Sequence, residues 1–376
     1  MRYILKQFDY ELITFELASD VIEGLSAQIV SINETHHPLL PIDLELSEKG
    51  LLTWLKRRVI PGNRLFVQNL LAKLGLNVGD TKGIIDVCKG LSVNDCYWIV
   101  EQGFEGSFRQ FNLYENRISR ILSFIAYTGY GETKRHGFIS TPELTTGGML
   151  AKCWRREQGT LYLYKAGSTG AANTGNEPYS EFYAAQVAKA MGLNCTPYNL
   201  RRWKKQLFST CPLFTSLELS YVPAGRVVNN GGWRAVMDYY RKLGDDYDQS
   251  LVDMLIFDAV ICNEDRHFNN FGLLLESGSN RVVAPAPIFD NGFSLFNYAM
   301  ADDLEDVDAY AQTRLMATSQ GFVEFAREII SKEQKNRLHK LVNFRFKRHP
   351  KYNLPAKRLE IIEQFIQMRI QQLINL

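Results

Sequence analysis

The pattern of apolar and polar positions in the first part of the chain changes from strand-like to helical. Residues 4–17 nearly alternate between the two kinds, which predicts one or two β-strands. Residues 51–58 and 65–75 carry apolar side chains at helical spacing, and Pro61-Gly62-Asn63 separates them. We therefore expect two short helices around a tight turn to follow the first strands.

The rest of the chain divides into a strand-rich part and a helical part. Strand-like apolar runs lie at residues 149–154, 160–165 and 206–215, and a helical pattern at 175–192 ends at Gly192. From about residue 217 helical spacing prevails, at 232–240, 247–260 and 359–376. The pattern predicts an α+β protein.

One polar cluster stands out among the apolar runs of the helical part. An apolar run from Ile256 leads into Asn263-Glu-Asp-Arg-His-Phe-Asn-Asn270, and a strand-like run follows. A second polar turn, Asp290-Asn-Gly292, comes further along. Two Asx turns that cap a hairpin would explain these residue types. They would not explain the spacing of three groups able to bind a metal, which are Asp265, Asn270 and Asp290.

These three groups suit phosphate transfer from ATP, which needs Mg²⁺ held by oxygen ligands and a carboxylate that orients the attacking hydroxyl. In protein kinases one Asp accepts the hydroxyl proton, an Asn five residues later binds metal, and a second Asp holds the metal against the phosphates. Asp265 and Asn270 have this spacing, and Asp290 is the natural second ligand. Arg266 and His267 follow the Asp here, whereas conventional kinases place His-Arg before it. We expect His267 only to support the loop.

The pattern Asn263-x-Asp265-x-His267-x-x-Asn270, followed by an apolar residue and Asp290, resembles the signature of HipA-like serine/threonine kinases. The resemblance covers residues 135–375 and implies a bilobal protein-kinase-like fold. It implies a β-rich small lobe at 131–216, a helical large lobe at 217–376 and an N-terminal accessory region at 1–130.

The same resemblance implies an activity. The γ-phosphoryl group of ATP would pass to a protein serine or threonine, with Asp265 as the catalytic base and Asn270 and Asp290 as Mg²⁺ ligands. It also implies an antitoxin or regulatory partner of the kind found in toxin–antitoxin pairs, and autophosphorylation, as in parts of the family.

A lysine at a strand end and a glutamate on the next helix complete the kinase pattern. Residues 160–165 end in Lys165, and the helical stretch carries Glu181. In kinases such a pair holds the α- and β-phosphates, so both residues are expected to bind ATP, with Lys165 also catalytic. A strand-end lysine alone is ordinarily a solvated charge, so this prediction depends on the order of the motifs. Glu177 is the alternative partner, disfavoured because we expect it to precede the helix.

Thr145-Thr146-Gly147-Gly148 lies between apolar runs before these motifs. Such a loop lets backbone N–H groups approach phosphate oxygens, although Gly-Gly between apolar runs is also an ordinary hairpin turn. Its place in the chain favours an ATP phosphate loop. The loop departs from the alanine- and glycine-rich form of the best-known toxins of the resembled family. Thr145 and Thr146 are candidate autophosphorylation sites.

Residues 213–216 are expected to connect the two lobes. Phe214 and Thr215 lie in this connector, where backbone groups would meet the adenine of ATP.

Composition excludes some other classes. The net charge is only +2, from 43 basic and 41 acidic residues, so no global field demands a polyanionic partner. The start of the chain lacks a signal-peptide core, and no run approaches the roughly eighteen apolar residues of a membrane helix. The six cysteines form no Cys-x-x-Cys and several lie in apolar runs, which favours free thiols in a reducing cytoplasm.

Two alternatives compete with the kinase hypothesis. One is a pseudokinase that binds nucleotide without turnover. The other is a nucleic-acid-binding protein that uses the basic residues of 56–64, or residues 335–358 with nine Lys or Arg and no Asp or Glu. We expect instead a helical hairpin packed on the fold in the first segment and an ordinary basic helical face in the second.

Overall fold

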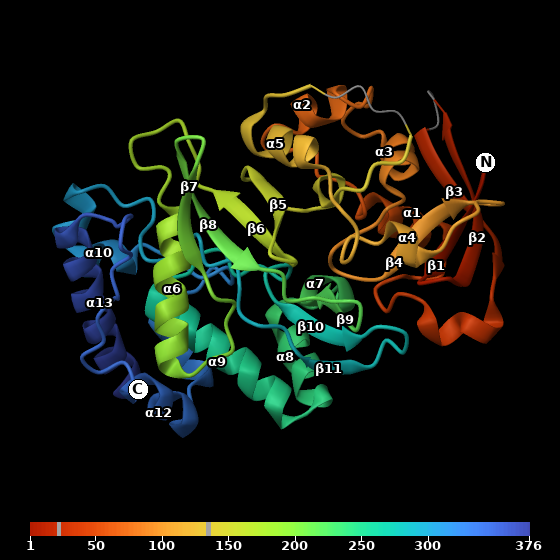
Figure 1. Ribbon diagram of the computed structural model, residues 1–376. Coiled ribbons are helices and arrows are strands. Elements are labelled where there is room, and N and C mark those ends of the chain that lie inside the picture. Colours follow the sequence, from red (N-terminus) through yellow and green to blue (C-terminus); the bar gives the residue numbers. More distant parts are fainter. Residues whose placement is uncertain (21–23, 133–136) are drawn as a thin grey trace. The chain divides into compact units, whose positions relative to one another are not determined.

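The computed structural model describes residues 1–20, 24–132 and 137–376, and its fold is mixed α+β, as predicted (Figure 1). The described chain forms two compact units, each built from segments that are not consecutive. The first unit comprises Met1–Tyr164, Leu213–Val222 and Leu274–Val283. The second comprises Lys165–Pro212, Pro223–Leu273 and Ala284–Leu376. The domain boundaries expected at residues 130 and 216 remain a prediction.

A four-stranded antiparallel sheet in the order β3-β2-β1-β4 dominates the start of the first unit (Figure 1). Its strands are β1 (Arg2–Gln7), β2 (Tyr10–Asp20), β3 (Gly24–Ile32) and β4 (Tyr97–Glu101). Near-alternation in residues 4–17 thus marks two strands, joined by a tight turn and paired so that Tyr3 faces Phe15. One face buries Leu5, Phe15 and Leu17 against helix α1 (Glu48–Lys56).

The other helices of the first unit are short: α2 (Val67–Ala72), α3 (Thr81–Cys88), α4 (Phe108–Phe111), α5 (Arg120–Thr128), and the 3₁₀ turns η1 (Glu34–Leu39) and η2 (Pro142–Leu144). Helices α1 and α2 confirm the two helices expected around Pro61. Between them, Arg58 and Arg64 are buried, at 5% and 2% exposure. They cannot reach a nucleic-acid groove, so the structure favours the packed helical hairpin.

The first unit also contains β5 (Lys152–Glu157), most of β6 (Thr160–Ala166), and the parts of β9 (Leu219–Pro223), β10 (Gly272–Glu276) and β11 (Val282–Pro285) that belong to it. The last three pair in the order β11-β10-β9. Trp98 and Phe108 from the N-terminal region share one apolar core with Trp154 and Leu161 of β5 and β6. The N-terminal region and these strands are therefore parts of one compact body.

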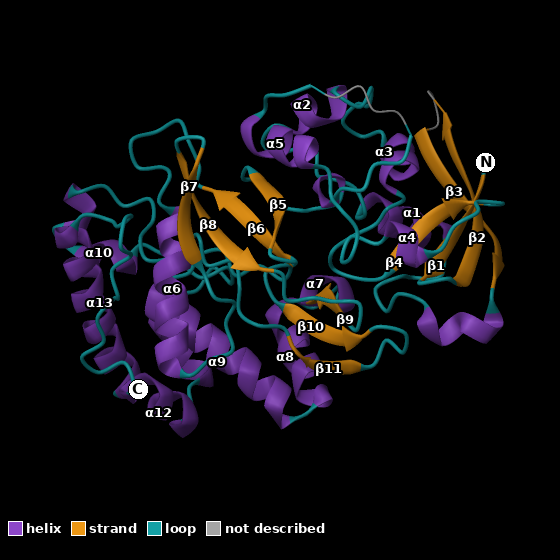
Figure 2. Cartoon of the chain, viewed as in Figure 1, coloured by secondary structure: helices purple, strands orange, loops and turns teal. Residues whose placement is uncertain are grey.

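Helices predominate in the second unit (Figure 2). They are α6 (Glu177–Met191), α7 (Ala224–Val227), α8 (Gly232–Leu243), α9 (Asp245–Ile261), α10 (Val307–Gln312), α11 (Phe322–Ile329), α12 (Lys332–His339), α13 (Ala356–Ile374) and the 3₁₀ turn η3 (Asp302–Leu304). Strands β7 (Asn199–Trp203) and β8 (Gln206–Pro212) form an antiparallel hairpin.

Helix α9 is the centre of this unit, since it contacts α6, α8, α11, α12 and α13. Asp245, Asp246 and Asp248 in its first turn complement the helix dipole. Every residue from Asp253 to Ile261 is buried, and Cys262 ends the helix with a positive φ of 50°. The helix therefore delivers the chain directly into the polar cluster from a fixed position.

The basic segment at residues 335–358 is not one helical face, contrary to expectation. Helix α12 ends at His339 and α13 begins at Ala356, and the residues between them are not helical. Part of its charge is neutralised, because Arg345 and Arg348 both lie within 4 Å of Glu363 (3.6 and 3.7 Å).

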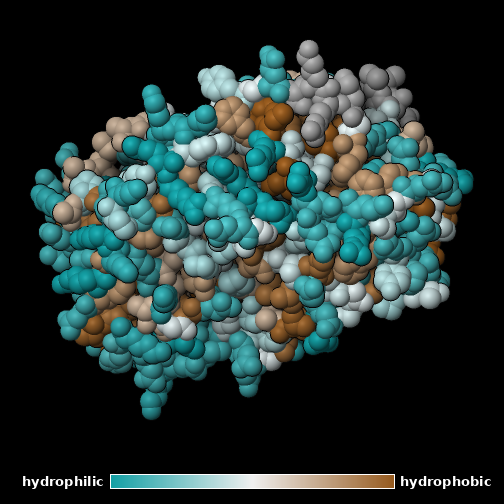
Figure 3. All heavy atoms as spheres, in the orientation of Figure 1, coloured by the Kyte–Doolittle hydropathy of each residue, from teal (hydrophilic) through white to brown (hydrophobic). Residues whose placement is uncertain are grey.

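Surface and composition agree with a chain that buries its core. Figure 3 shows hydrophobic residues in scattered groups among hydrophilic ones on the face drawn. In the parts of the chain that the structure describes, no helix has the length and apolar character to span a membrane. All six cysteines are free thiols, as predicted, and Cys195 alone among them is not buried.

Candidate active site

Lys165, near the end of β6, is paired with Glu181 on α6. Its Nζ lies 2.9 Å from Glu181 Oε1 and also contacts Asp290 Oδ1. Lys165 and Glu181 are 7% and 0% exposed. Burial by itself would lower the pKa of Lys165, but the charges of Asp290 and Glu181 outweigh it and raise the pKa. The structure thus holds a permanent cation between two carboxylates.

Glu177, the alternative partner, has other contacts. It is the first residue of α6, so the expectation that it precedes the helix is wrong. Its carboxylate accepts hydrogen bonds from Ser168 N at 3.1 Å and from the Tyr298 hydroxyl at 2.9 Å. The structure therefore brings Glu181, and not Glu177, to Lys165.

The signature loop (residues 263–270) is held by bonds within itself. Asn270 Nδ2 donates to the Asp265 carbonyl at 2.9 Å, and Asp265 N donates to Asn263 Oδ1 at 3.2 Å. The side-chain oxygen of Asn270, the atom able to bind a metal, is not used in that bond. The side chain of His267 is exposed, and its backbone N–H donates to the Asp265 carbonyl at 2.8 Å. This backbone bond is one contact by which His267 supports the loop.

Arg266 joins the two polar turns, and the sequence interpretation gave it no role. Its guanidinium, 1% exposed, makes a bidentate pair with Asp258 of α9 at 2.9 and 3.0 Å. It also donates to the Asn270 carbonyl at 3.0 Å, the Phe289 carbonyl at 2.6 Å and Asn291 Oδ1 at 2.5 Å. One side chain therefore fixes the signature loop, the Asp290 turn and α9 to each other.

The Asp290 turn adopts a strained backbone. Asp290 has φ of +57°, which an L-residue adopts at a cost, and such strain is frequent at functional sites. A backbone bond from Thr196 N to the Ile288 carbonyl and a bond from Asn291 N to the Glu181 side chain at Oε2, both 2.9 Å, hold the turn in place. Asp290 N also donates to the Tyr198 hydroxyl at 3.2 Å.

Gly292 allows the Asp290 turn to approach the lysine. A Cβ atom at this position would lie 3.3 Å from Glu177 Cβ and 3.5 Å from Lys165 Nζ. A side chain at position 292 would therefore be crowded against Glu177 and the lysine.

Asp265 lies in the field of this cluster. Burial raises the pKa of its carboxyl; the charge of His267 lowers it, that of Asp290 raises it, and that of Lys165 lowers it, with a net rise. The structure therefore brings Asp265, Asp290 and Lys165 within electrostatic reach of one another, with Asn270 bonded to the Asp265 backbone.

The donors present fit Mg²⁺. Among the described residues, no group of three or more His, Cys, Asp or Glu is arranged to hold a metal ion. Mg²⁺ does not need such a cage, because it is usually bound by one or two carboxylates and the oxygens of a bound phosphate. For such a site, Asp290 would supply one carboxylate and Asn270 one amide oxygen.

The predicted phosphate loop (residues 145–148) belongs to the first unit. Thr145 Oγ1 donates to the Leu91 carbonyl at 2.8 Å, and Thr146 Oγ1 donates to the Pro142 carbonyl at 2.7 Å. Gly147 and Gly148 are exposed, and Gly148 has φ of +84°. Both hydroxyls are thus tied to backbone while the glycines stay accessible.

Lys152 is a further cation at this loop that the sequence interpretation missed. Only 7% of it is exposed, and a Cβ at Gly148 would lie 2.2 Å from its Nζ. The ammonium group therefore lies directly against the backbone of Gly148, whose φ of +84° favours glycine. A basic residue starting a strand gave no signal of this in sequence.

The predicted connector also belongs to the first unit. Phe214 packs edge-on against Tyr221, with ring centroids 5.5 Å apart. Thr215 is 6% exposed, and its hydroxyl donates to the Val93 carbonyl. Thr215 and Leu217 line a cavity of about 290 Å³ together with Tyr114 and Arg156.

Fold and site together define a mixed α+β protein with a buried lysine–carboxylate cluster. Residues 144–343 match the family model described as a HipA-like C-terminal domain. This match covers more than half of the 376 residues, so the chain belongs to the HipA-like family. The HipA-like family, which the pattern of residues 263–270 and Asp290 resembles, is confirmed.

Two solved structures are similar to the chain. HipA of Shewanella oneidensis MR-1, in a complex with HipB and operator DNA, is 12% identical, and the match covers 100% of this chain and 99% of that chain with a TM-score of 0.51. The Helicobacter pylori proinflammatory kinase CtkA is 19% identical over 59% of this chain and 89% of its own, with a TM-score of 0.45. No curated protein matches the chain. The HipA likeness shows that the shared fold includes the N-terminal region.

Proposed function

We propose that the protein is an ATP-dependent serine/threonine protein kinase that uses Mg²⁺. The observation that supports this most directly is the contact of Lys165 with both Glu181 and Asp290, within reach of Asp265. A buried cation between a helix glutamate and a metal-binding aspartate is the arrangement with which kinases hold ATP phosphates.

Each residue has a definite role in this proposal. Lys165, kept in place by Glu181, binds phosphate oxygens, and Asp265 accepts the proton of the attacking hydroxyl. Asn270 and Asp290 hold Mg²⁺, which supplies charge neutralisation at the phosphates when bound. Arg266 positions both turns but touches no reacting atom.

The finer assignments belong to the same proposal. They are the bilobal arrangement, ATP phosphate binding by residues 145–148 with Lys152, adenine contact at Phe214 and Thr215, and autophosphorylation at Thr145 or Thr146. They are supported by family membership and by the order of the motifs along the chain. A regulatory protein partner is proposed because the similar HipA was solved with HipB.

Replacement of Asp290 by Asn is expected to abolish Mg²⁺-dependent nucleotide binding, because the carboxylate is the one charged metal ligand proposed. Calorimetric titration of ATP with Mg²⁺ and with EDTA measures this. The exposed Asp302 supplies a matched control, since Asp302→Asn changes the net charge equally in an acidic surface turn. Undiminished Mg²⁺-dependent binding in Asp290→Asn would contradict the proposal.

Activity is expected to fall in acid at a pH above the ordinary range of an aspartate. The pKa of Asp265 is raised, and only its ionised form can accept a proton, so activity is present above that pKa and lost as pH falls through it. Because the charge of His267 lowers this pKa, His267→Ala should move the acid limb of the kcat/KM profile to higher pH. If the acid limb of this variant lay at the same pH as that of the unaltered protein, the charge of His267 would not affect the pKa of Asp265.

The pseudokinase alternative keeps the same pocket and differs only in turnover. Incubation with γ-labelled ATP and total cell lysate separates the two, because only a kinase transfers label to protein. Nucleotide binding without any transfer would favour the pseudokinase.

A further inference from the structure

A loop of the N-terminal region presents its backbone carbonyls to both proposed nucleotide-binding segments of the first unit. In this carbonyl loop (residues 90–96), the Leu91 carbonyl accepts from Thr145 Oγ1 at 2.8 Å. The Val93 carbonyl accepts from the Thr215 hydroxyl. Neighbouring acceptors of one short loop are thus bonded to the phosphate loop and to the connector.

Further bonds attach the residues that follow the connector to the same loop. Tyr221 N donates to the Asn94 carbonyl at 2.7 Å, and Cys96 Sγ lies 3.5 Å from the Leu217 carbonyl. The Tyr114 hydroxyl donates to the Val93 carbonyl at 3.0 Å. The loop therefore contacts Thr215 of the connector and, just after the connector, Leu217 and Tyr221, which restricts the freedom of that segment to shift.

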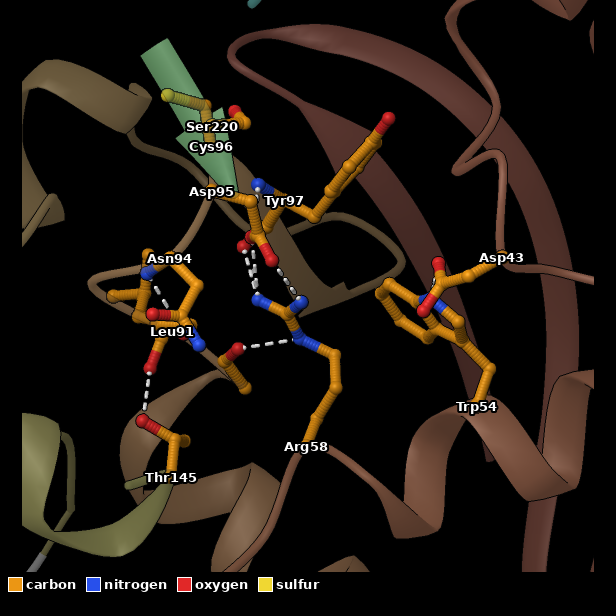
Figure 4. A network of polar contacts seen from close by, with 12 residues as sticks. Asp43, Trp54, Arg58, Leu91, Asn94, Asp95, Cys96, Tyr97, Thr145 and Ser220 are labelled. Atoms are coloured by element: carbon orange, nitrogen blue, oxygen red, sulfur yellow. Dashed lines mark hydrogen bonds and ion pairs between the residues drawn. The ribbon is translucent and has the colours of Figure 1, made fainter. Parts of the chain in front are cut away.

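A network of polar contacts centred on Arg58 holds the carbonyl loop (Figure 4). Arg58 forms a bidentate pair with Asp95, both bonds 2.9 Å, and donates to the Gly90 carbonyl at 2.8 Å and the Tyr97 carbonyl at 2.9 Å. Its guanidinium also lies over the Trp54 ring, 4.7 Å from the centroid. Because Arg58 is buried, these bonds are shielded from water and hold both ends of the loop.

Packing adds to the hydrogen bonds. Leu91, Val93 and Cys96 are at most 4% exposed and belong to the apolar cluster that contains Trp154 and Leu161. The carbonyl loop cannot move without disturbing the strands that follow the phosphate loop.

We propose that the carbonyl loop positions the phosphate loop and the connector, so that the N-terminal region is a working part of the nucleotide site. This inference depends on the proposed kinase function, and it gives residues 1–130 a role that the motifs do not. Tyr114 and Arg58 act here as positioning residues, since Arg58 reaches the nucleotide segments only through the loop and Tyr114 holds the Val93 carbonyl that Thr215 also uses.

Tyr114→Phe tests the inference, because it removes only the hydroxyl that holds Val93 and leaves the ring in place. We expect the Kd for Mg-ATP to rise about fivefold, as loss of one hydrogen bond would produce. Arg58→Lys, which cannot make the bidentate pair, should raise Kd about tenfold or more if it folds. Calorimetry well below the unfolding temperature gives both values.

Tyr3→Phe is the matched control. Its hydroxyl donates to Asp86 Oδ1 at 2.7 Å in the same unit, and this bond involves no residue of the carbonyl loop. It should lower Tm without changing Kd. Hydrogen exchange should also become faster at residues 145–149 in Tyr114→Phe and not in Tyr3→Phe, a difference that a general loss of stability would not produce.

The outcomes separate the two proposals. If the unaltered protein does not bind Mg-ATP, the proposed function fails, and the exchange measurement alone decides whether the loop orders residues 145–149. If it binds Mg-ATP and Tyr114→Phe has the same Kd and the same exchange rates, the positioning role is overturned and the kinase proposal stands.

Discussion

Replacement of Asp265 by Asn is expected to reduce phosphate transfer by about two to four orders of magnitude, the usual contribution of a positioned general base. The amide has the shape of the carboxylate but cannot accept the hydroxyl proton. The bonds that hold the signature loop at this residue use its backbone, so the loop should keep its conformation. Labelling of protein from γ-labelled ATP measures the loss.

The same variant should not lose stability at neutral pH. The raised pKa of Asp265 means that its ionised form is less favourable in the folded protein than in the unfolded chain. Above that pKa this penalty is fully present, and it disappears as pH falls through it. Asn removes the charge, so Tm near pH 7 should equal or exceed that of the unaltered protein.

Glu264 offers the control, because it is a neighbouring carboxylate that is partly buried near Arg314, 3.6 Å away, and has no proposed role in transfer. Glu264→Gln should keep activity within a few-fold. Equal labelling by Asp265→Asn and the unaltered protein would rule out Asp265 as the base.

The parts of the site that the sequence predicted have local patterns. Lys165 lies near the end of a strand, Glu181 lies on the next helix, and Asp265 and Asn270 belong to one short loop. Strand and helix periodicities located the elements that carry them. The choice of Glu181 over Glu177 agrees with the contacts, although for a different reason, since both residues lie on α6.

The parts of the site that the sequence did not predict depend on contacts between residues far apart in the chain. Arg266 looked like a substituted kinase residue, and its contacts with Phe289 and Asn291 cannot be deduced from spacing. Asp258, an acidic residue within the apolar run of α9, was the available signal, because a buried carboxylate requires a cationic partner. The carbonyl loop was undetectable, since backbone acceptors leave no trace in side-chain patterns.

Replacement of Arg266 by Met is expected to lower the free energy of unfolding by about 3–5 kcal/mol, because it leaves the Asp258 carboxylate buried without its cation. Asp258 is 0% exposed, and Asn263 Nδ2, at 2.9 Å, would be its remaining side-chain donor. The Asn270 and Phe289 carbonyls also lose a donor. Urea unfolding followed by circular dichroism measures the loss.

A second variant separates two effects of Arg266, which are neutralising the Asp258 carboxylate and tying the signature loop to the Asp290 turn. In Asp258→Leu with Arg266→Met the unpaired charge is gone, so most of the stability should return, as it does when buried ion pairs are replaced by apolar residues. Phosphate transfer should not return, because nothing then ties the Asn270 carbonyl to the Asp290 turn. If both stability and phosphate transfer returned, Arg266 would act only by neutralising Asp258. Recovery of stability alone would show that this arginine sets the separation of the two turns on which catalysis depends.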